Sequence, residues 1–178
     1  MSIFKRVSNL FRAEKNKDQE VEAKRTIHNL KVNDIITYDL EDYLVVGKLV
    51  YNHGGYIWNA YNLKGDTGYI WLSVEVDDEI ELGIFKKIQT KIQTPDHHKL
   101  EIDGNVYYQE EQGEASITEV EGQAGAVVGQ RVQYWSYEVD EDQSLQYPYL
   151  SVEKWGGDLE ISKGYSISEH ELTILAGS

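Results

Sequence analysis

Residues 69–76 read Tyr-Ile-Trp-Leu-Ser-Val-Glu-Val, and residues 149–155 read Tyr-Leu-Ser-Val-Glu-Lys-Trp. In both stretches an apolar residue occupies every second position, as in a strand with one buried face. That face carries Ile70, Leu72, Val74 and Val76 in the first stretch and Leu150 and Val152 in the second. The two stretches therefore predict two strands of the same kind, each with an apolar core face.

Similar segments, rich in Val, Ile, Tyr, Trp and Thr and separated by turn residues, run from about residue 28 to the end. Asp103-Gly104-Asn105 lies between two of them and is a strong hairpin signal. The chain contains about ten to twelve such segments and no long helical pattern in this region. Many short strands at this spacing indicate an all-β sandwich or barrel-like domain.

The strand pattern also contains an internal repeat. Leu-Ser-Val-Glu begins at Leu72 and again at Leu150, and Trp58 and Trp135 precede the two copies. Two copies are too few for a solenoid, but they fit two β units packed together. We therefore predict two similar units, about residues 32–99 and 100–175, in a domain of residues 28–178.

Charge is unevenly distributed along the 178 residues, which have a net charge of −14. Residues 1–31 contain eight Lys and Arg against four Asp and Glu, whereas the remainder contains nine against 27. The acidic body excludes nucleic acid as a partner, because it repels phosphates. Its acidity either serves solubility alone or attracts a cationic ligand or a basic partner. The chain has no cysteine, which fits a cytoplasmic location.

Residues 1–27 are predicted to form a short basic amphipathic helix followed by a charged linker. The apolar stripe and its basic flanks consist of Ile3, Phe4, Val7, Leu10 and Phe11, with Lys5, Arg6 and Arg12 beside them. A helix of about three turns is marginal in water, so it needs a surface on which to form. Three surfaces remain open: an anionic membrane, a partner helix, or the protein's own body.

The second face of the two repeated strands is the candidate binding surface. Trp71 and Glu75 lie on it in the first copy, and Tyr149 and Glu153 lie on it in the second. Aromatic rings beside carboxylates suit a cationic ligand, through cation–π and ion-pair contacts. The alternative is ordinary cross-strand packing beneath a neighbouring loop.

Catalytic, cofactor and metal motifs are missing from the sequence. It has no G-x-S-x-G, no Gly-rich phosphate loop and no H-E-x-x-H. The adjacent His97 and His98 would point to opposite faces of a strand, so we predict no metal site. Asp77-Asp78-Glu79 and Asp140-Glu141-Asp142 do not follow the calcium-loop pattern and are expected to be solvated turns. We therefore expect neither enzyme activity nor a cofactor.

Several motifs between about residues 30 and 170 resemble the bacterial family called domain of unknown function 4178. They are Val32-Asn-Asp34-Ile, Tyr43 to Tyr51, Trp58 to Leu63, Trp71 to Glu75, Glu111 to Ala115 and Tyr149 to Gly156. Where the family has Gly before the first Asp, this chain has Asn33, which also tolerates tight turns. The opening residues 1–11 are similar to the amphipathic starts of phage-shock protein A relatives.

The resemblance implies two functions, because members are encoded near phage-shock-type membrane-stress proteins and near enzymes resembling those of polyamine synthesis. The first is a non-enzymatic interaction module of a cytoplasmic membrane-stress system. Residues 2–13 would bind it to the inner face of the cell membrane or to a membrane-associated helical protein. The second is a binding domain for a small cation of the polyamine type, with Trp71, Glu75, Tyr149 and Glu153 as the site.

Overall fold

The computed structural model describes residues 24–177 except 91, 93, 96–97 and 141–142. The described chain forms eleven strands and two short 3₁₀ turns, so the predicted all-β fold is confirmed, with a strand count inside the predicted range. The elements are η1 (Ile27–Asn29), β1 (Ile35–Tyr38), β2 (Glu41–His53), β3 (Tyr56–Gly65), β4 (Gly68–Val76), β5 (Ile80–Ile88), β6 (Lys99–Ile102), β7 (Asn105–Gly122), β8 (Arg131–Val139), β9 (Tyr149–Trp155), β10 (Asp158–Ile167), η2 (Glu169–Glu171) and β11 (Thr173–Leu175).

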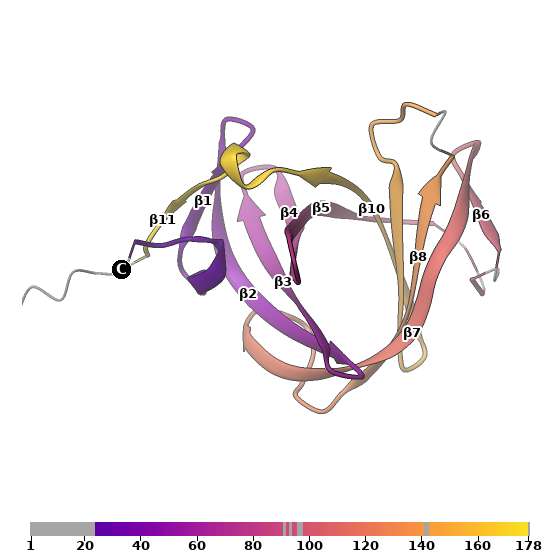
Figure 1. Ribbon diagram of the computed structural model, residues 1–178, viewed down its shortest axis with the longest axis horizontal. Helices are drawn as coiled ribbons and strands as arrows, with labels where there is room; N and C mark the ends of the chain where they lie inside the picture. The colour runs from indigo at the N-terminus through magenta and orange to yellow at the C-terminus, as the bar shows by residue number, and fades with distance from the viewer. Residues whose placement is uncertain (1–23, 91, 93, 96–97, 141–142, 178) are drawn as a thin grey trace, which may run out of the picture.

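Eight of these strands close into a barrel (Figure 1). Their order is β2-β3-β4-β5-β10-β9-β8-β7, and β7 returns to pair with β2 along residues 116–122 and 47–52. Every pairing around the barrel is antiparallel. Strands β1 and β11 extend the sheet beyond β2, and β6 extends it beyond β7. Closure leaves the eight barrel strands without a free edge.

The two halves of the barrel have the same construction. In each half a short strand forms a hairpin with a long one, and three further antiparallel strands follow: β1 to β5 in the first half and β6 to β10 in the second. The two copies of Leu-Ser-Val-Glu lie in β4 and β9, the fourth strand of each half. Trp58 and Trp135 lie in the third strands, β3 and β8.

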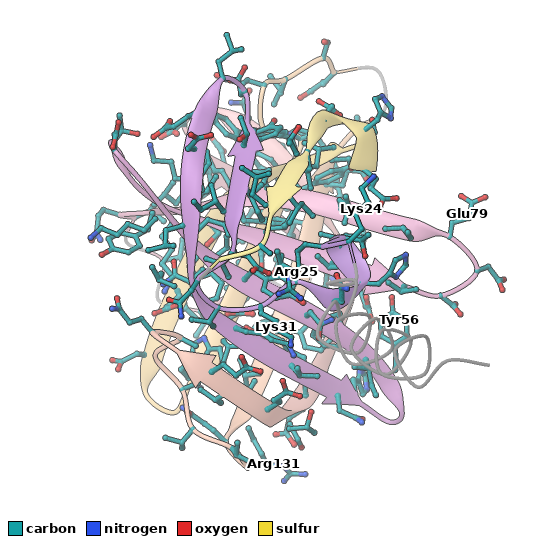
Figure 2. The ribbon with its side chains drawn as sticks, turned by 90° about the vertical axis from the view of Figure 1, so that its left-hand side faces the viewer. Lys24, Arg25, Lys31, Tyr56, Glu79 and Arg131 are labelled. Atoms are coloured by element: carbon teal, nitrogen blue, oxygen red, sulfur yellow. The ribbon has the colours of Figure 1, made fainter. Side chains whose placement is uncertain are left out.

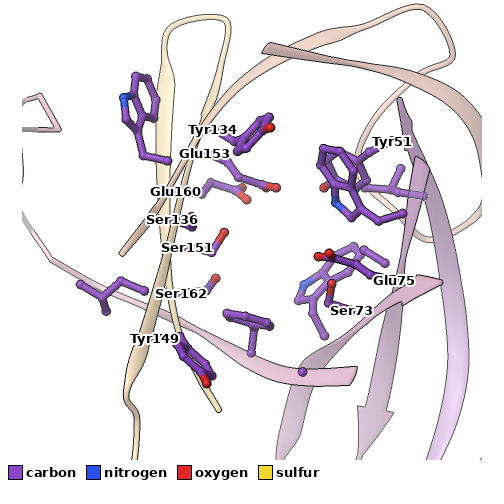
Figure 3. Close-up of a pocket in the computed structure, with 18 of the residues that line it drawn as sticks. Tyr51, Ser73, Glu75, Tyr134, Ser136, Tyr149, Ser151, Glu153, Glu160 and Ser162 are labelled. Carbon is purple, nitrogen blue, oxygen red and sulfur yellow. The ribbon is translucent and has the colours of Figure 1, made fainter. Parts of the chain in front are cut away.

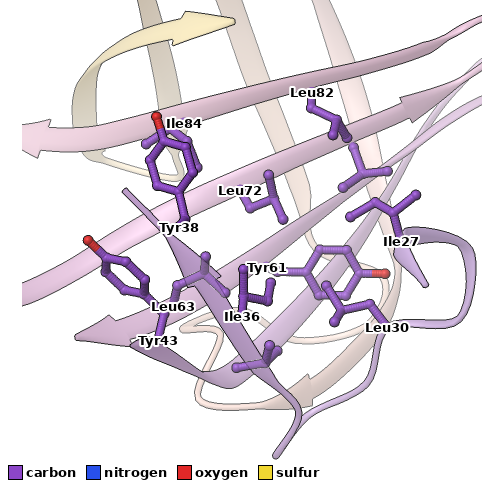
Figure 4. Packing of buried hydrophobic residues seen from close by; sticks show 12 residues of the cluster. Ile27, Leu30, Ile36, Tyr38, Tyr43, Tyr61, Leu63, Leu72, Leu82 and Ile84 are labelled. Atoms are coloured by element: carbon purple, nitrogen blue, oxygen red, sulfur yellow. The ribbon is translucent and has the colours of Figure 1, made fainter. Parts of the chain in front are cut away.

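The apolar core has three clusters, and two of them are separate layers outside the barrel wall. The third lies inside the barrel and includes Leu49 and Tyr51 of β2. On the first half, Leu72 and Val74 of β4 are 0% and 1% exposed beneath β1 and η1 (Figure 4). On the second half, Leu150 and Val152 of β9 are equally buried beneath β6. Burying one such side chain contributes about 1.5–3 kcal/mol, so these layers hold the fold together. Because side chains alternate, the opposite face of the same strands turns into the barrel.

The sequence-based boundaries needed three corrections. Val76 was expected in the core but is 50% exposed, because β4 ends there and an exposed turn follows. Where many short strands were expected, residues 105–122 form one 18-residue strand, β7, with an irregularity between Gln109 and Glu111. Ile27, placed in the linker from its sequence context, is 1% exposed in the first core layer.

The predicted amphipathic helix, with Ile3, Phe4, Lys5, Arg6, Val7, Leu10, Phe11 and Arg12, lies outside the described residues. No helix of the described part is long and apolar enough to cross a membrane.

A buried carboxylate joins the two ends of the described chain. Asp34 is 1% exposed and accepts hydrogen bonds from the backbone N–H of Lys31 at 2.7 Å and of Gly177 at 2.9 Å. The Nε of Arg25, a residue labelled in Figure 2, lies 2.8 Å from Asp34 Oδ2. The preceding residue, Asn33, has φ of 76°, a left-handed conformation that Gly and Asn tolerate best. Asn33 therefore suits the backbone conformation that this turn requires.

Candidate ligand cavity inside the barrel

Two matching rows of one aromatic residue and two glutamates lie on opposite halves of the inner wall. Cross-strand pairing across β3, β4 and β5 aligns Trp58, Glu75 and Glu81. Pairing across β8, β9 and β10 aligns Tyr134, Glu153 and Glu160. Figure 3 shows Glu75 on one wall facing Glu153 and Glu160 on the other. The repeated sequence therefore builds the same chemical row twice.

The neighbouring row of inward-facing side chains, two residues along each strand, explains why the barrel is hollow. In the first half it consists of Ala60, Ser73 and Gly83, and in the second half of Ser136, Ser151 and Ser162. Side chains this small cannot meet across an eight-stranded barrel, whereas larger ones would fill it. They leave a cavity of about 650 Å³, which is in the range of pockets for small organic molecules.

Aromatic rings form one end of the cavity. Tyr51 stacks on Trp58 with ring centroids 4.9 Å apart, and Trp58 meets Tyr134 edge-on at 5.4 Å. Trp155 meets Tyr51 edge-on at 6.2 Å. These contacts join rings from β2, β3, β8 and β9, so the cluster spans both halves. Such pairs contribute about 0.5–1.5 kcal/mol each beyond their buried area, which fixes the shape of this end.

A second group of aromatic side chains, Trp71 and Phe85, lines the cavity on β4 and β5. Trp71 of β4 lies beside Phe85 of β5 in the pairing register. A Cβ built on Gly164 of β10 would overlap the Phe85 ring, so the ring lies directly against that glycine. The absence of a side chain at Gly164 thus allows Phe85 to cross to the neighbouring strand.

Glu153 is a half-buried acid held by two aromatic donors. Trp155 Nε1 donates a hydrogen bond to Glu153 Oε2 at 3.0 Å. Burial raises the pKa of Glu153, and hydrogen bonds from Trp155 and Tyr51 offset part of that rise. The nearby charge of Glu160 raises the pKa further, while that of Lys87 lowers it. A cation beside Glu153 would relieve this unfavourable burial.

Glu75 occupies the corresponding position on the first half. The Tyr56 hydroxyl donates to Glu75 Oε2 at 2.6 Å. Burial raises the pKa of Glu75, and the hydrogen bond from Tyr56 offsets part of that rise. The charges of Glu81 and Glu111 also raise it. Both repeated glutamates are therefore acids whose charged form is disfavoured by burial and by neighbouring carboxylates.

The cavity is strongly acidic. Of the described residues that line it, eight are Asp or Glu, and Lys87 alone is Lys or Arg. Lys87 Nζ lies 2.6 Å from Glu160 Oε2 and 5.7 Å from the centre of the Trp71 ring. Even with this lysine, the lining carries a large excess of negative charge, which attracts cations.

A smaller hollow of about 250 Å³ shares Tyr56, Glu75 and Glu81 with the main cavity. Its other lining residues are those of the β4–β5 turn, Asp77-Asp78-Glu79, all of which are exposed. Figure 2 shows Glu79 on this turn, projecting from the body. The acidic turn thus extends the negative surface from the cavity outward.

The four residues singled out from the sequence, Trp71, Glu75, Tyr149 and Glu153, all line this one cavity. Sequence reasoning missed Glu81, Glu160 and Lys87, whose inward direction depends on how β5 and β10 pair with their neighbours. The available signal was the alternation along residues 81–87, which places every second side chain on the face of Glu81.

The described residues were searched for clusters of metal-ligating side chains. They contain no group of three or more His, Asp or Glu side chains that could hold a metal ion. His97 lies outside the described residues, so the arrangement of the His97–His98 pair stays a prediction.

Comparison with known proteins places the chain in a family. The model of the family "Domain of unknown function (DUF4178)" matches residues 31–169. Uncharacterized proteins of Mycobacterium bovis and of two Mycobacterium tuberculosis strains are each 31% identical over 144 residues, covering 79% of this chain and 68% of the relative. No solved structure matches the chain. The chain belongs to the DUF4178 family.

Proposed function

We propose that this chain is a non-enzymatic binding domain that holds a small organic cation of the polyamine type inside its barrel. The observation that carries this proposal is the pair of opposed aromatic–Glu–Glu rows around a hollow of about 650 Å³. An ammonium group gains from a carboxylate and from the face of a Trp or Tyr ring at the same time.

The arrangement favours a ligand with more than one ammonium group. One glutamate pair, Glu75 and Glu81, belongs to the first half, and the other, Glu153 and Glu160, belongs to the second. A linear chain with a cationic group at each end satisfies both pairs, while its methylene groups cross the small-residue row. A cation with a single charge pairs with only one of the two carboxylate pairs, so it gains less binding free energy than a ligand with two.

Burial makes the empty site unfavourable and the occupied one favourable. Ion pairs are stronger away from bulk water, where fewer solvent dipoles screen the charges. The pKa of Glu75 and of Glu153 is raised chiefly by burial, so both acids gain when a cation enters.

Calorimetric titration with spermidine at low salt tests the proposal. Wild type is expected to give saturable heat, and the double substitution Glu75→Gln with Glu153→Gln is expected to weaken binding at least tenfold. Glu101→Gln removes one acid from β6, where the residue is exposed, and serves as the matched control. Absence of saturable heat with wild type would refute this function.

A second role belongs to residues 2–13, and we propose that they attach the protein to the membrane as part of a cytoplasmic membrane-stress system of the phage-shock type. The apolar stripe with basic flanks supports this, since each Lys or Arg near an anionic surface contributes about 1 kcal/mol. A membrane-associated helical protein of that system is the other surface on which this segment would form a helix.

Flotation with anionic liposomes tests the membrane attachment. The full chain is expected to float, whereas a chain lacking residues 2–13, or one carrying Phe4→Glu and Phe11→Glu, is expected to stay at the bottom. If the full chain does not float, membrane attachment is wrong, and a pull-down with residues 2–13 as bait then tests the partner-helix alternative.

A further inference from the structure

Lys87 enters the cavity from β5. Residues 81, 83, 85 and 87 alternate onto the inner face of this strand, and Lys87 pairs with Ser162 of β10 in the register. Its ammonium lies between a carboxylate and an indole ring: 2.6 Å from Glu160 Oε2 and 5.7 Å from the Trp71 centroid. These are the two contacts that a ligand ammonium is expected to make in this site.

We propose that Lys87 is a built-in competitor that occupies one cation subsite, so that a ligand ammonium must displace it to reach Glu160 and Trp71. The inference rests on the proposed cation-binding function. It assigns Lys87 the role of setting the affinity and selectivity of the site.

The lysine is poised for displacement. The side chains of Lys87 and Glu160 are 48% and 40% exposed, so water competes for both charges. Ion pairs with this exposure contribute only about 0–1 kcal/mol, and the long stem of lysine can swing its ammonium into solvent. By contrast, Lys163, which pairs with Asp103 on the second half, has a side chain only 19% exposed.

Displacement has a consequence for selectivity. A ligand that brings one ammonium merely replaces the lysine at this subsite and gains little there. A ligand that brings a second ammonium also pairs with the acids of the opposite half, Glu75 and Glu81, where no described lysine or arginine lines the cavity. The lysine thereby favours multiply charged cations over singly charged ones such as choline.

Removing the lysine charge provides the test. Lys87→Met keeps the length and apolar character of the stem but leaves Glu160 and Trp71 open to the ligand. Spermidine affinity is expected to rise about tenfold, because the lost ion pair and cation–π contact no longer oppose binding. Choline affinity is expected to rise at least as much, so the preference for spermidine narrows.

Lys86→Met is the matched control. Lys86 is the neighbouring residue on β5, is exposed and lies on the opposite face of the strand, so its loss changes net charge equally but leaves the cavity unchanged. Its spermidine affinity is expected to stay within about twofold of wild type. An equal rise in both variants would mean that net charge alone acts, and this would overturn the proposal.

The remaining outcomes separate this inference from the proposed function. If wild type binds spermidine and Lys87→Met binds it equally or more weakly, the competitor role is wrong and cation binding stands. If only Lys87→Met binds, Lys87 blocks the site in wild type, and the proposed function of the wild-type protein fails. If neither binds, both proposals fail. Thermal unfolding of each variant shows whether a loss of binding is a loss of fold. Lys87→Gln, which also removes the charge but keeps a polar side chain, is tested beside Lys87→Met for the same reason.

Discussion

Substitution of the buried Asp34 by Ala is expected to destabilise the protein strongly. The carboxylate accepts two backbone hydrogen bonds, from Lys31 and Gly177, and pairs with Arg25. Its removal leaves these three groups without their acceptor in a site where Asp34 is 1% exposed. Breaking a buried ion pair from one side costs about 3–5 kcal/mol, because the remaining charge and donors stay buried.

Urea denaturation followed by tryptophan fluorescence measures the loss. With a slope of about 2 kcal/mol per molar urea, the midpoint is expected to fall by about 2 M. Asp34→Asn keeps one acceptor oxygen and is expected to lose less. Glu114→Ala is the control, since Glu114 is ion-paired with Arg131 but the two side chains are 43% and 73% exposed, and it is expected to cost under about 1 kcal/mol. A loss below about 1 kcal/mol for Asp34→Ala would refute the buried-anchor reasoning.

Three further predictions concern single positions. The pKa of Glu153 is higher in the folded protein than in the unfolded chain. This residue therefore contributes stability below about pH 4.5, and that contribution is lost as pH rises through the folded-state pKa. Glu153→Gln should therefore melt above wild type at pH 8, with an advantage that shrinks towards pH 4.5 in calorimetric scans. Gly164→Ala should cost about 1–3 kcal/mol in denaturant unfolding, since the new methyl group overlaps Phe85; a neutral result would contradict that packing. Asn33→Val should lower the free energy of unfolding by about 1–2 kcal/mol and Asn33→Gly by almost nothing, because valine is strained at the φ of 76° found here and glycine is not. Equal denaturation midpoints for the two variants would exclude backbone strain as the cause.

Much of the fold was predictable from local patterns. Alternation along residues 69–76 assigned Leu72 and Val74 to the core and Trp71 and Glu75 to the other face, and both assignments hold in the structure. Asp103-Gly104 forms the expected hairpin turn, with both residues at positive φ. These features depend on neighbouring residues only, so the sequence carries them directly.

Barrel closure was not predictable in the same way. It depends on pairing between residues 47–52 of β2 and 116–122 of β7, which are about 70 residues apart. Each strand has the same alternation whether it belongs to a sandwich or to a barrel. A single sequence therefore left both architectures open. It also did not show whether the apolar face or the aromatic and Glu face of each strand would lie on the outside of a barrel.

The candidate site was predictable in part for the same reason. Glu75 and Glu153 belong to the repeated motif and were found from it. Glu81 and Glu160 are single acids near turns, and they become part of the site only because cross-strand register places them beside the repeated pair. Lys87 was not singled out because an exposed lysine in a strand gives no distinctive pattern.

The location of the two apolar layers has an evolutionary consequence. Because these two layers lie outside the barrel wall, substitutions at inner positions that do not belong to the third core cluster leave the folding free energy of the layers in place. The inner wall can therefore diversify under selection for binding while the scaffold is inherited unchanged. Among relatives of this chain, differences at positions 75, 87, 153 and 160 are expected to record changes of ligand rather than repairs to stability.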